Sequence, residues 1–299
     1  QPVLLVLLSE KACRLEMYQI SIDASSKAID AITSNTKNKD ELYHLGLARF
    51  YRGLSYLKLI QPDLQEFHCQ DKLRFDSAAD FLKASLHFNE AKSMNNAKLS
   101  LSYFVSTVSV GEDYPNFRSL TTQLLSDSIQ IARKVNIPDE LRVRLFRIFL
   151  KALIDQKDWP LCKKTIQNAI GQLNKTFIGG IWELNLIVTF NADCQKSEQP
   201  LIDEMLRVKQ LGNEEYQSKL WTFVADLSHD KEIQQTSLIK AINVLNQEDV
   251  EERFRAHLNY ARWLYQNNFE WAEINKIISQ SEETIKDLPP EKNIELKIE

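Results

Sequence analysis

Glycine is scarce in this chain of 299 residues, which contains only 7. Average usage would give roughly 21 glycines in a chain of this length. Parallel α/β folds and β-sandwiches need glycine for turns, bulges and phosphate-binding loops, whereas packed helices do not. Hydrophobic residues make up 43% of the chain and charged residues 26%, the balance of an ordinary folded domain. The glycine deficit therefore favours an all-α protein.

Cysteine is also sparse, and its four positions form no C-x-x-C pair. Scattered single cysteines are typical of a reducing compartment, where cysteine serves as a small apolar residue, and they predict a cytoplasmic protein. His68-Cys69 is the only adjacent pair of soft metal ligands, and no second pair lies at zinc spacing. We therefore expect no metal site and no metal cofactor.

The chain opens without a recognisable signal sequence. The apolar run Val3 to Leu8 has no basic residue before it and no small-residue cleavage site after it. It is also far shorter than the roughly 20 residues needed to cross a bilayer. Because the chain begins with Gln1 rather than Met, we expect it to be a piece of a larger protein whose first helix lacks a neighbour.

Motifs for nucleotide binding or hydrolysis are missing as well. The sequence has no G-x-G-x-x-G, no P-loop and no G-x-S-x-G, and its only double glycine, Gly179-Gly180, opens a helix-like segment. We interpret that pair as a hinge between repeats. The formal net charge of −4 argues against bulk attraction to nucleic acid or anionic membranes. We expect no catalytic residues and no cofactor.

What the second half of the chain does contain is a repeat with a period of 36 residues. Stepping from Ala241 in this period gives an apolar residue each time, and so do the positions three before and one after it. On a helix these offsets lie on one face, which predicts a buried face. The twelve positions are Ile166, Ile202, Leu238 and Ile274; Ala169, Met205, Ala241 and Ile277; and Ile170, Leu206, Ile242 and Ile278.

A second apolar segment precedes each of these helices, and a polar break such as "SHDKE" or "QNN" separates the two. Helix-turn-helix units of this length are close to the tetratricopeptide (TPR) repeat of about 34 residues. The unit around Trp221 carries the degenerate TPR pattern, with Val224 and Ala225 on its first helix. We therefore expect an α-solenoid of TPR-like helix-turn-helix repeats, regular over residues 136–288.

The remaining segments repeat less regularly. Residues 1–135 predict irregular helical repeats with an insertion near 59–76, where Pro62 breaks a helix. Further breaks are expected at 111–115 and beside Pro138. Residues 289–299 are interpreted as a C-terminal tail or the start of a further helix.

Two clusters are candidates for contact with a partner. Trp263, Tyr265 and Trp271 form an aromatic hairpin, for which we expect packing between adjacent helices; a groove that grips a partner peptide is the alternative. A basic stripe is interleaved with apolar residues, and it is either a solvated face or a contact for acidic protein tails or nucleic acid. The stripe consists of Arg142, Arg144, Arg147 and Lys151.

Three segments near the C-terminal end, "KLWTFVADLS" (219–228), "LIKAINVL" (238–245) and "ARWLYQNNF" (261–269), resemble a known family in their order and spacing. It is the TPR-like family of cilia- and flagella-associated protein forty-six, and the resemblance covers Lys219 to Leu288. It implies a structural role in ciliary or flagellar motility, within a projection of the C1 microtubule of the axonemal central pair. Other large helical-repeat and calmodulin-associated subunits assemble there, and the family brings no catalytic residues. Another large ciliary TPR-like protein is the alternative.

Three functions remain open at this point. The first is a scaffold segment that assembles protein subunits in a microtubule-attached ciliary structure, without nucleic acid, membrane or small-molecule substrate. The second is a soluble TPR-type adaptor that binds short peptide motifs in a Lys- and Asn-lined groove, although the first helices show no such ladder. The third is an α-helical enzyme domain, for which no pocket chemistry is apparent.

Overall fold

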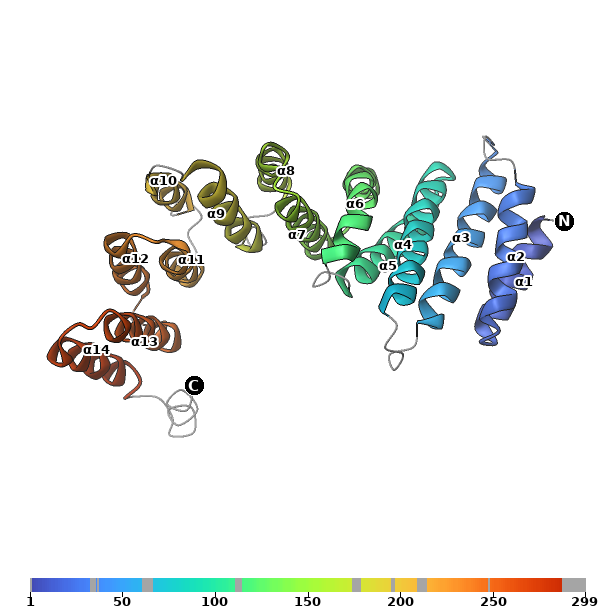
Figure 1. Ribbon diagram of the computed structural model, residues 1–299. Coiled ribbons are helices and arrows are strands. Elements are labelled where there is room, and N and C mark those ends of the chain that lie inside the picture. Colours follow the sequence, from blue (N-terminus) through green and yellow to red (C-terminus); the bar gives the residue numbers. More distant parts are fainter. Residues whose placement is uncertain are drawn as a thin grey trace. The chain divides into compact units, whose positions relative to one another are not determined.

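The computed structural model describes residues 2–32, 36, 38–60, 67–110, 115–173, 179–194, 197–208, 214–246 and 248–286. Within these ranges it contains fourteen α-helices and no strand (Figure 1). The expectation of an all-α protein is confirmed. The chain divides into two compact units, residues 1–178 and 179–299. The division falls directly before the double glycine at 179–180 rather than at the change in repeat regularity expected near residue 135.

The first unit contains eight helices that contact one another mainly in chain order. Each helix packs against the next, and additional contacts join α1 to α3, α4 to α6 and α5 to α7. Long-range packing is therefore built from neighbouring helices. The helices are α1 (Pro2–Arg14), α2 (Tyr18–Ala31), α3 (Lys39–Leu59), α4 (Phe67–Glu90), α5 (Met94–Val110), α6 (Pro115–Val135), α7 (Asp139–Asp155) and α8 (Trp159–Gln172).

The insertion expected near 59–76 stays a prediction. Residues 67–76 form the first turns of α4, which continues to Glu90. Helix α3 ends at Leu59, and Pro62, where a helix break was expected, lies outside the described residues. The break beside Pro138 is confirmed, because Pro138 is the N-cap residue of α7. Of the break at 111–115, only Pro115 is described, and it is the first residue of α6.

Four helix-to-helix turns share one backbone geometry. A left-handed residue follows each helix, at Glu16, Lys92, Lys157 and Asn268, with φ between 57° and 62°. The next amide then donates to the carbonyl oxygen five residues earlier, as in Met17 to Ala12 at 2.8 Å. This Schellman-type bond satisfies the last carbonyls of the helix and reverses the chain. The same turn therefore joins α1 to α2, α4 to α5, α7 to α8 and α13 to α14.

Helices α3 and α4 approach each other closely because two glycines of α3 lie against aromatic rings of α4. A Cβ atom at Gly46 would lie 2.9 Å from the ring of Phe88, and one at Gly53 would lie 3.2 Å from the ring of Phe81. Both phenylalanines are fully buried. Phe81 also stacks on Tyr103 of α5, with 5.2 Å between ring centroids. Glycine here serves helix packing rather than turn formation.

We expect Gly46→Ala to lower the free energy of unfolding by about 1–3 kcal/mol, because the added methyl group overpacks the Phe88 contact. The steric cost outweighs the roughly 1 kcal/mol by which alanine is normally favoured in a helix. Gly171→Ala in α8 is the matched control, because nothing lies within 4 Å of the position that its added methyl group would occupy. We expect Gly171→Ala to raise the free energy of unfolding, measured by urea denaturation, by up to about 1 kcal/mol. Equal stability of the two variants would contradict the close-packing account.

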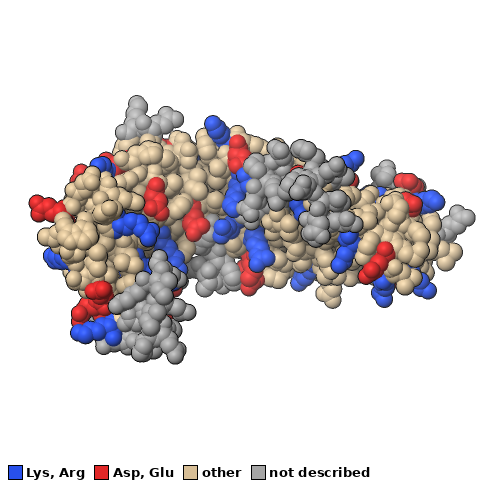
Figure 2. Space-filling model, turned by 60° about the horizontal axis from the view of Figure 1, so that its bottom comes forward, with Lys and Arg blue, Asp and Glu red and all other residues tan. Residues whose placement is uncertain are grey.

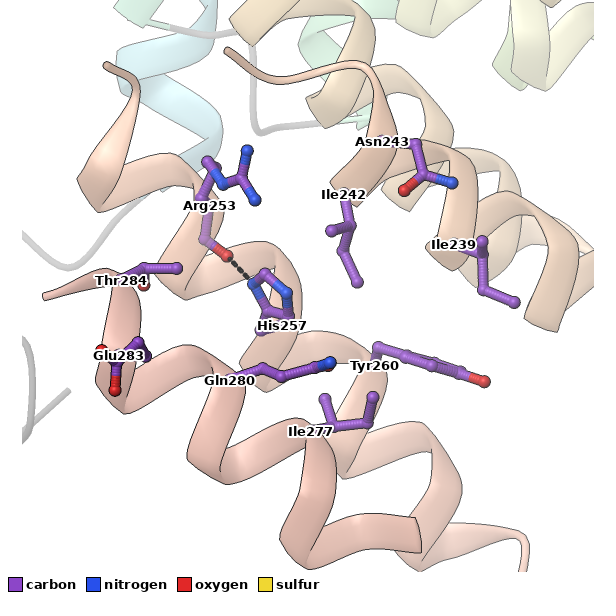
Figure 3. A pocket seen from close by; sticks show the side chains of 10 residues that line it. All are labelled: Ile239, Ile242, Asn243, Arg253, His257, Tyr260, Ile277, Gln280, Glu283 and Thr284. Atoms are coloured by element: carbon purple, nitrogen blue, oxygen red, sulfur yellow. Dashed lines mark hydrogen bonds between the residues drawn. The ribbon is translucent and has the colours of Figure 1, made fainter. Parts of the chain in front are cut away.

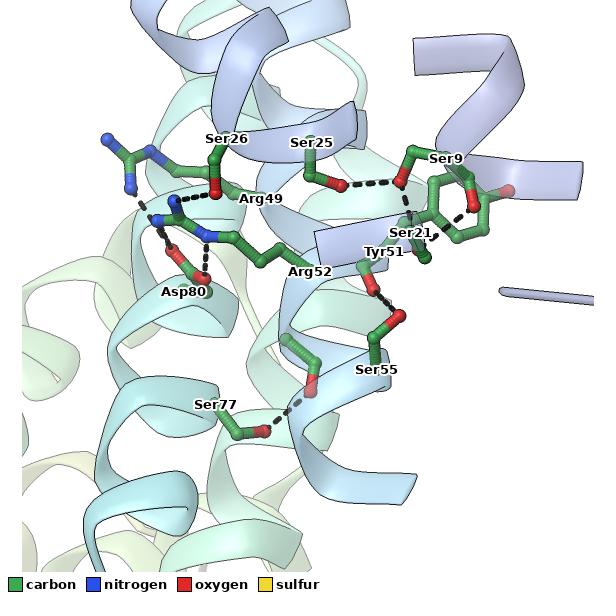
Figure 4. A network of polar contacts seen from close by, with 11 residues as sticks. Ser9, Ser21, Ser25, Ser26, Arg49, Tyr51, Arg52, Ser55, Ser77 and Asp80 are labelled. Carbon is green, nitrogen blue, oxygen red and sulfur yellow. Dashed lines mark hydrogen bonds and ion pairs between the residues drawn. The ribbon is translucent and has the colours of Figure 1, made fainter. Parts of the chain in front are cut away.

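Polar side chains connect α1, α2, α3 and α4 inside the first unit (Figure 4). The Asp80 carboxylate accepts hydrogen bonds from Arg52 Nε at 2.7 Å and Arg52 Nη2 at 2.9 Å, and from Arg49 Nη1 at 3.1 Å. Arg52 Nη1 also donates to Ser26 Oγ of α2 at 3.1 Å. The Asp80 side chain is 4% exposed, so this ion pair is almost dry. A single carboxylate thus holds two half-buried guanidinium groups.

The first helix carries an apolar face that the described residues leave uncovered. Val6, Ser9 and Ala12 of α1 are buried. Val3, Leu4, Leu7 and Leu8 are exposed. The two sets lie on different sides of one helix, so α1 has a buried side and an exposed side that is rich in leucine.

The described residues of the second unit form six helices. Neighbours in the chain again pack together, and α11 contacts both α9 and α13. Asp230 caps α12, where its side chain accepts hydrogen bonds from the amides of Glu232 and Ile233 at 2.8 and 3.3 Å. The helices are α9 (Gly179–Asp193), α10 (Gln199–Val208), α11 (Glu214–Leu227), α12 (Lys231–Asn243), α13 (Val250–Gln266) and α14 (Trp271–Thr284). Residues 289–299, expected to be a tail or a further helix, lie outside the described part of the chain.

The positions in the 36-residue period lie on the second helix of each pair, α8, α10, α12 and α14. Half of the twelve are buried: Ile166, Ala169, Met205, Leu238, Ala241 and Ile274. Ile202 and Ile277 are half-buried, as are Ile170, Ile242 and Ile278. Leu206 is 54% exposed, so the third position of the period is not part of the buried face in α10.

Candidate docking grooves

A groove of the second unit lies among α12, α13 and α14 and has a volume of about 590 Å³ (Figure 3). Ile239 and Ile242 of α12 form one wall, and Ile277 of α14 lies across from them. Ile239 is 38% exposed, so part of its side chain is available to a ligand. Asn243 and Gln280 also line the groove. Apolar walls with a few polar groups are typical of a binding site.

His257 lies in the middle of this groove, where α13 meets α14 (Figure 3). Its Nδ1 atom is 2.7 Å from the carbonyl oxygen of Arg253, a geometry that assigns the proton to Nδ1. Burial lowers the pKa of His257; the hydrogen bond to the Arg253 carbonyl opposes this shift, and the positive charge of Arg253 adds to it. A lowered pKa keeps the imidazole neutral near pH 7, with Nε2 as an acceptor. His257 therefore presents a neutral hydrogen-bond acceptor to the groove, whose charged lining residues are Arg253 and Glu283.

A compact aromatic core of the second unit lies next to this groove. Trp263 lies between Tyr260 and Phe269, with ring centroids 6.2 and 5.4 Å away. Its Nε1 atom donates to Gln234 Oε1 of α12 at 2.8 Å. Tyr260 lines the groove with its other side. The core thus fixes the positions of α12 and α13 on both sides of the groove.

The expectation that all three hairpin aromatics pack between helices is wrong for two of them. Trp263 is 9% exposed, but Tyr265 and Trp271 are 66% and 62% exposed. Tyr265 follows Trp263 by two residues, which places it on the opposite side of α13. Phe269, not Trp271, packs against Trp263 at the turn. The two exposed rings therefore flank the hairpin without belonging to its core.

The remaining TPR-like position on a first helix, Trp221 of α11, is 7% exposed. Lys240 Nζ of α12 lies 4.5 Å from its ring centroid, a cation–π contact within the second unit.

A smaller groove of about 260 Å³ lies between α11 and α13. Lys219 and Arg255 line it, but both are already close to a carboxylate of the same surface. Glu252 Oε1 lies 3.5 Å from Lys219 Nζ and 3.4 Å from Arg255 Nη1. A peptide carboxylate would have to displace Glu252, so this arrangement does not favour a TPR-type carboxylate clamp.

The predicted basic stripe of α7 is divided between two faces of the helix. Arg142 donates to Asp139 Oδ1 at 3.1 Å and to the carbonyl oxygens of Ile137 at 3.0 Å and Gln172 at 3.4 Å. It therefore ties α7 to the end of α8 and to the preceding turn. The other three basic residues, Arg144, Arg147 and Lys151, lie on the opposite face because their offsets from Arg142 turn the helix by roughly half a circle. Arg144 is exposed and the other two are half-buried.

No group of three or more His, Cys, Asp or Glu residues is placed to hold a metal ion in the described ranges. His68 and Cys69 lie within α4, but their side chains are outside the described part of the structure. None of the described helices is long and apolar enough to span a bilayer.

The sequence did not identify the groove residues Ile239, His257 and Gln280. Each comes from a different helix, so no linear motif links them. One signal was present: the adjacent apolar pair Leu238-Ile239 places one member outside the buried stripe.

Comparison with known proteins adds no identification. No family model matches the chain, and no curated protein matches it.

Proposed function

We propose that this chain is a protein-binding scaffold segment, built as a TPR-like α-solenoid. Recurrence of one Schellman-type turn at four helix junctions supports a repeat architecture, because the chain then reverses direction in the same way at each of them. The buried positions of the 36-residue period on α8, α10 and α12 support it further. Such arrays bind partners over extended surfaces rather than in a reaction centre.

The observation that carries the binding function is the groove among α12, α13 and α14. It has a partly exposed apolar wall, a neutral histidine acceptor and amide side chains, together with one basic and one acidic residue, Arg253 and Glu283. An amphipathic segment of a partner protein fits this combination, since its apolar residues would cover Ile239 and Ile277 while polar ones meet Asn243 and Gln280. We assign the groove to such a segment.

For the setting of the scaffold we propose the ciliary axoneme, within a projection of the central apparatus. The support is the resemblance of residues 219–288 to the family of cilia- and flagella-associated protein forty-six. In this setting the partners are other protein subunits of a microtubule-attached assembly, and the chain has no catalytic role.

Cosedimentation with salt-washed ciliary axonemes tests the scaffold. We expect the chain to rebind the axonemes and Ile239→Glu to weaken rebinding about tenfold, because a charge would enter the apolar wall; tenfold corresponds to about 1.4 kcal/mol. Leu206→Glu is the matched control, since Leu206 is also an exposed apolar residue but lies on α10, outside the groove. Rebinding that is absent, or equal for Ile239→Glu and the unchanged chain, would contradict the proposal.

The cellular location is tested separately with an antibody raised against the chain. Staining along the axoneme of ciliated cells supports the ciliary setting. Staining that is absent from cilia would overturn it while leaving the groove experiment unaffected.

A further inference from the structure

The segment that forms α6, α7 and α8 is basic in an otherwise acidic chain. Residues 115–173 contain 10 Lys and Arg and 5 Asp and Glu, a net charge of +5, whereas the whole chain carries −4. Residues 174–299 contain 14 basic and 22 acidic residues, a net charge of −8. Figure 2 shows basic side chains gathered in groups on the face that it presents. Such segregation attracts anionic partners to one part of a surface.

Within this basic segment, α6, α7 and α8 enclose a groove of about 260 Å³. Phe146 and Phe149 of α7 lie at its base and are almost fully buried. Ile129 of α6 is half-buried, and Leu161 of α8 is 37% exposed at its edge. The volume is below the roughly 300 Å³ at which small-molecule pockets begin, so the groove accepts a side chain rather than a whole ligand.

Two basic residues stand at the rim of this groove, and no acidic residue lines it. Arg133 of α6 and Lys164 of α8 are both exposed. Arg133 Nε donates to Gln172 Oε1 at 3.3 Å, and neither residue pairs with a carboxylate of the described chain. By contrast, Arg118, near the other end of α6, has Asp155 Oδ2 at 2.6 Å. The charges of Arg133 and Lys164 therefore remain available to a ligand.

We propose that the groove between α6 and α8 binds an acidic segment of a partner protein through one large apolar side chain. The apolar side chain lies against Ile129 and Leu161, and flanking carboxylates pair with Arg133 and Lys164. This inference deepens the proposed scaffold function, on which it rests, by naming the chemistry of one partner. Nucleic acid fits less well because Phe146 and Phe149 are too buried to offer ring faces for base stacking.

The test is fluorescence anisotropy with a short fluorescein-labelled peptide rich in Glu that carries one Phe and one Leu. Three further probes accompany it: the same peptide with Gln for Glu, the same peptide with Ala for Phe and Leu, and a labelled oligothymidine. We expect the first peptide to bind most tightly and its affinity to fall with added salt.

The double variant Arg133→Glu with Lys164→Glu is expected to weaken binding of the first peptide at least about tenfold. The matched control is Arg144→Glu with Arg147→Glu, which changes the net charge equally but lies on the opposite face of α7. That control should lose less than about threefold. Leu161→Ser, an edge substitution that leaves the buried residues in place, should weaken the first peptide but not the alanine-substituted one.

Three results would overturn the inference. Equal losses in the two double variants would mean that only overall charge matters. Tighter binding of oligothymidine than of the peptide would point to nucleic acid instead. Self-association of the chain that disappears in Arg133→Glu with Lys164→Glu would identify a second copy as the occupant. Axoneme rebinding is measured without these peptides. A failure of peptide binding would therefore overturn this inference without contradicting the scaffold proposal.

Discussion

Replacing Asp80 with alanine lowers the free energy of unfolding of the first unit by about 3–5 kcal/mol, the range for breaking a buried ion pair from one side. The physical reason is that Arg49 and Arg52 remain half-buried without their shared carboxylate. Their side chains are only 16% and 20% exposed, so water cannot fully replace Asp80. Urea denaturation followed by circular dichroism measures the loss.

Asp127→Ala is the control for this prediction, because Asp127 is exposed on α6 and accepts one hydrogen bond, from Gln123 at 3.1 Å. We expect it to change stability by no more than about 0.5 kcal/mol. Replacing all three charged residues together, by Arg49→Met, Arg52→Met and Asp80→Leu, should recover much of the lost free energy of unfolding. Similar stabilities of Asp80→Ala and Asp127→Ala would refute the importance of the ion pair.

The second large effect is expected in the other unit. Trp263→Ala should cost about 3–5 kcal/mol, because it removes a buried ring from between Tyr260 and Phe269 and leaves a cavity. It also deprives Gln234 Oε1 of its hydrogen-bond donor. Amide hydrogen exchange can assign the loss to one unit, since faster exchange should appear in 214–286.

Trp271→Ala provides a control on the same hairpin. Trp271 is 62% exposed, so its removal should cost less than about 1 kcal/mol. Comparable destabilisation by the two tryptophan substitutions, or faster exchange after Trp263→Ala in 2–173 alone, would contradict the assignment of Trp263 to the core of the second unit.

The helices were predictable because they depend on local patterns. A 36-residue apolar period correctly placed α8, α10, α12 and α14, and the polar breaks located the turns between paired helices. The period failed at Leu206, which is exposed. Leu206 is next to the buried Met205 on α10 but lies outside the buried face, so apolar character at a repeat position does not by itself predict burial.

The candidate sites were harder to predict because they depend on which face of each helix meets a neighbour. Arg142 belongs to the basic stripe in the sequence, yet its donors are used by Asp139 and by carbonyl oxygens of the turn and of α8. The sequence pattern did not identify Arg133 and Lys164, because they are 31 residues apart and come together only through the packing of α6 and α8 around α7. Helical periodicity contains no information on that packing.

The exposed leucines of α1 have a practical consequence for protein engineering. An exposed apolar helix face promotes aggregation at high concentration. Helical repeat proteins are commonly made more soluble by a terminal hairpin with a polar outer surface. Fusing such a hairpin ahead of Pro2, with small residues facing Leu4 and Leu8, would cover these leucines without touching the grooves described above.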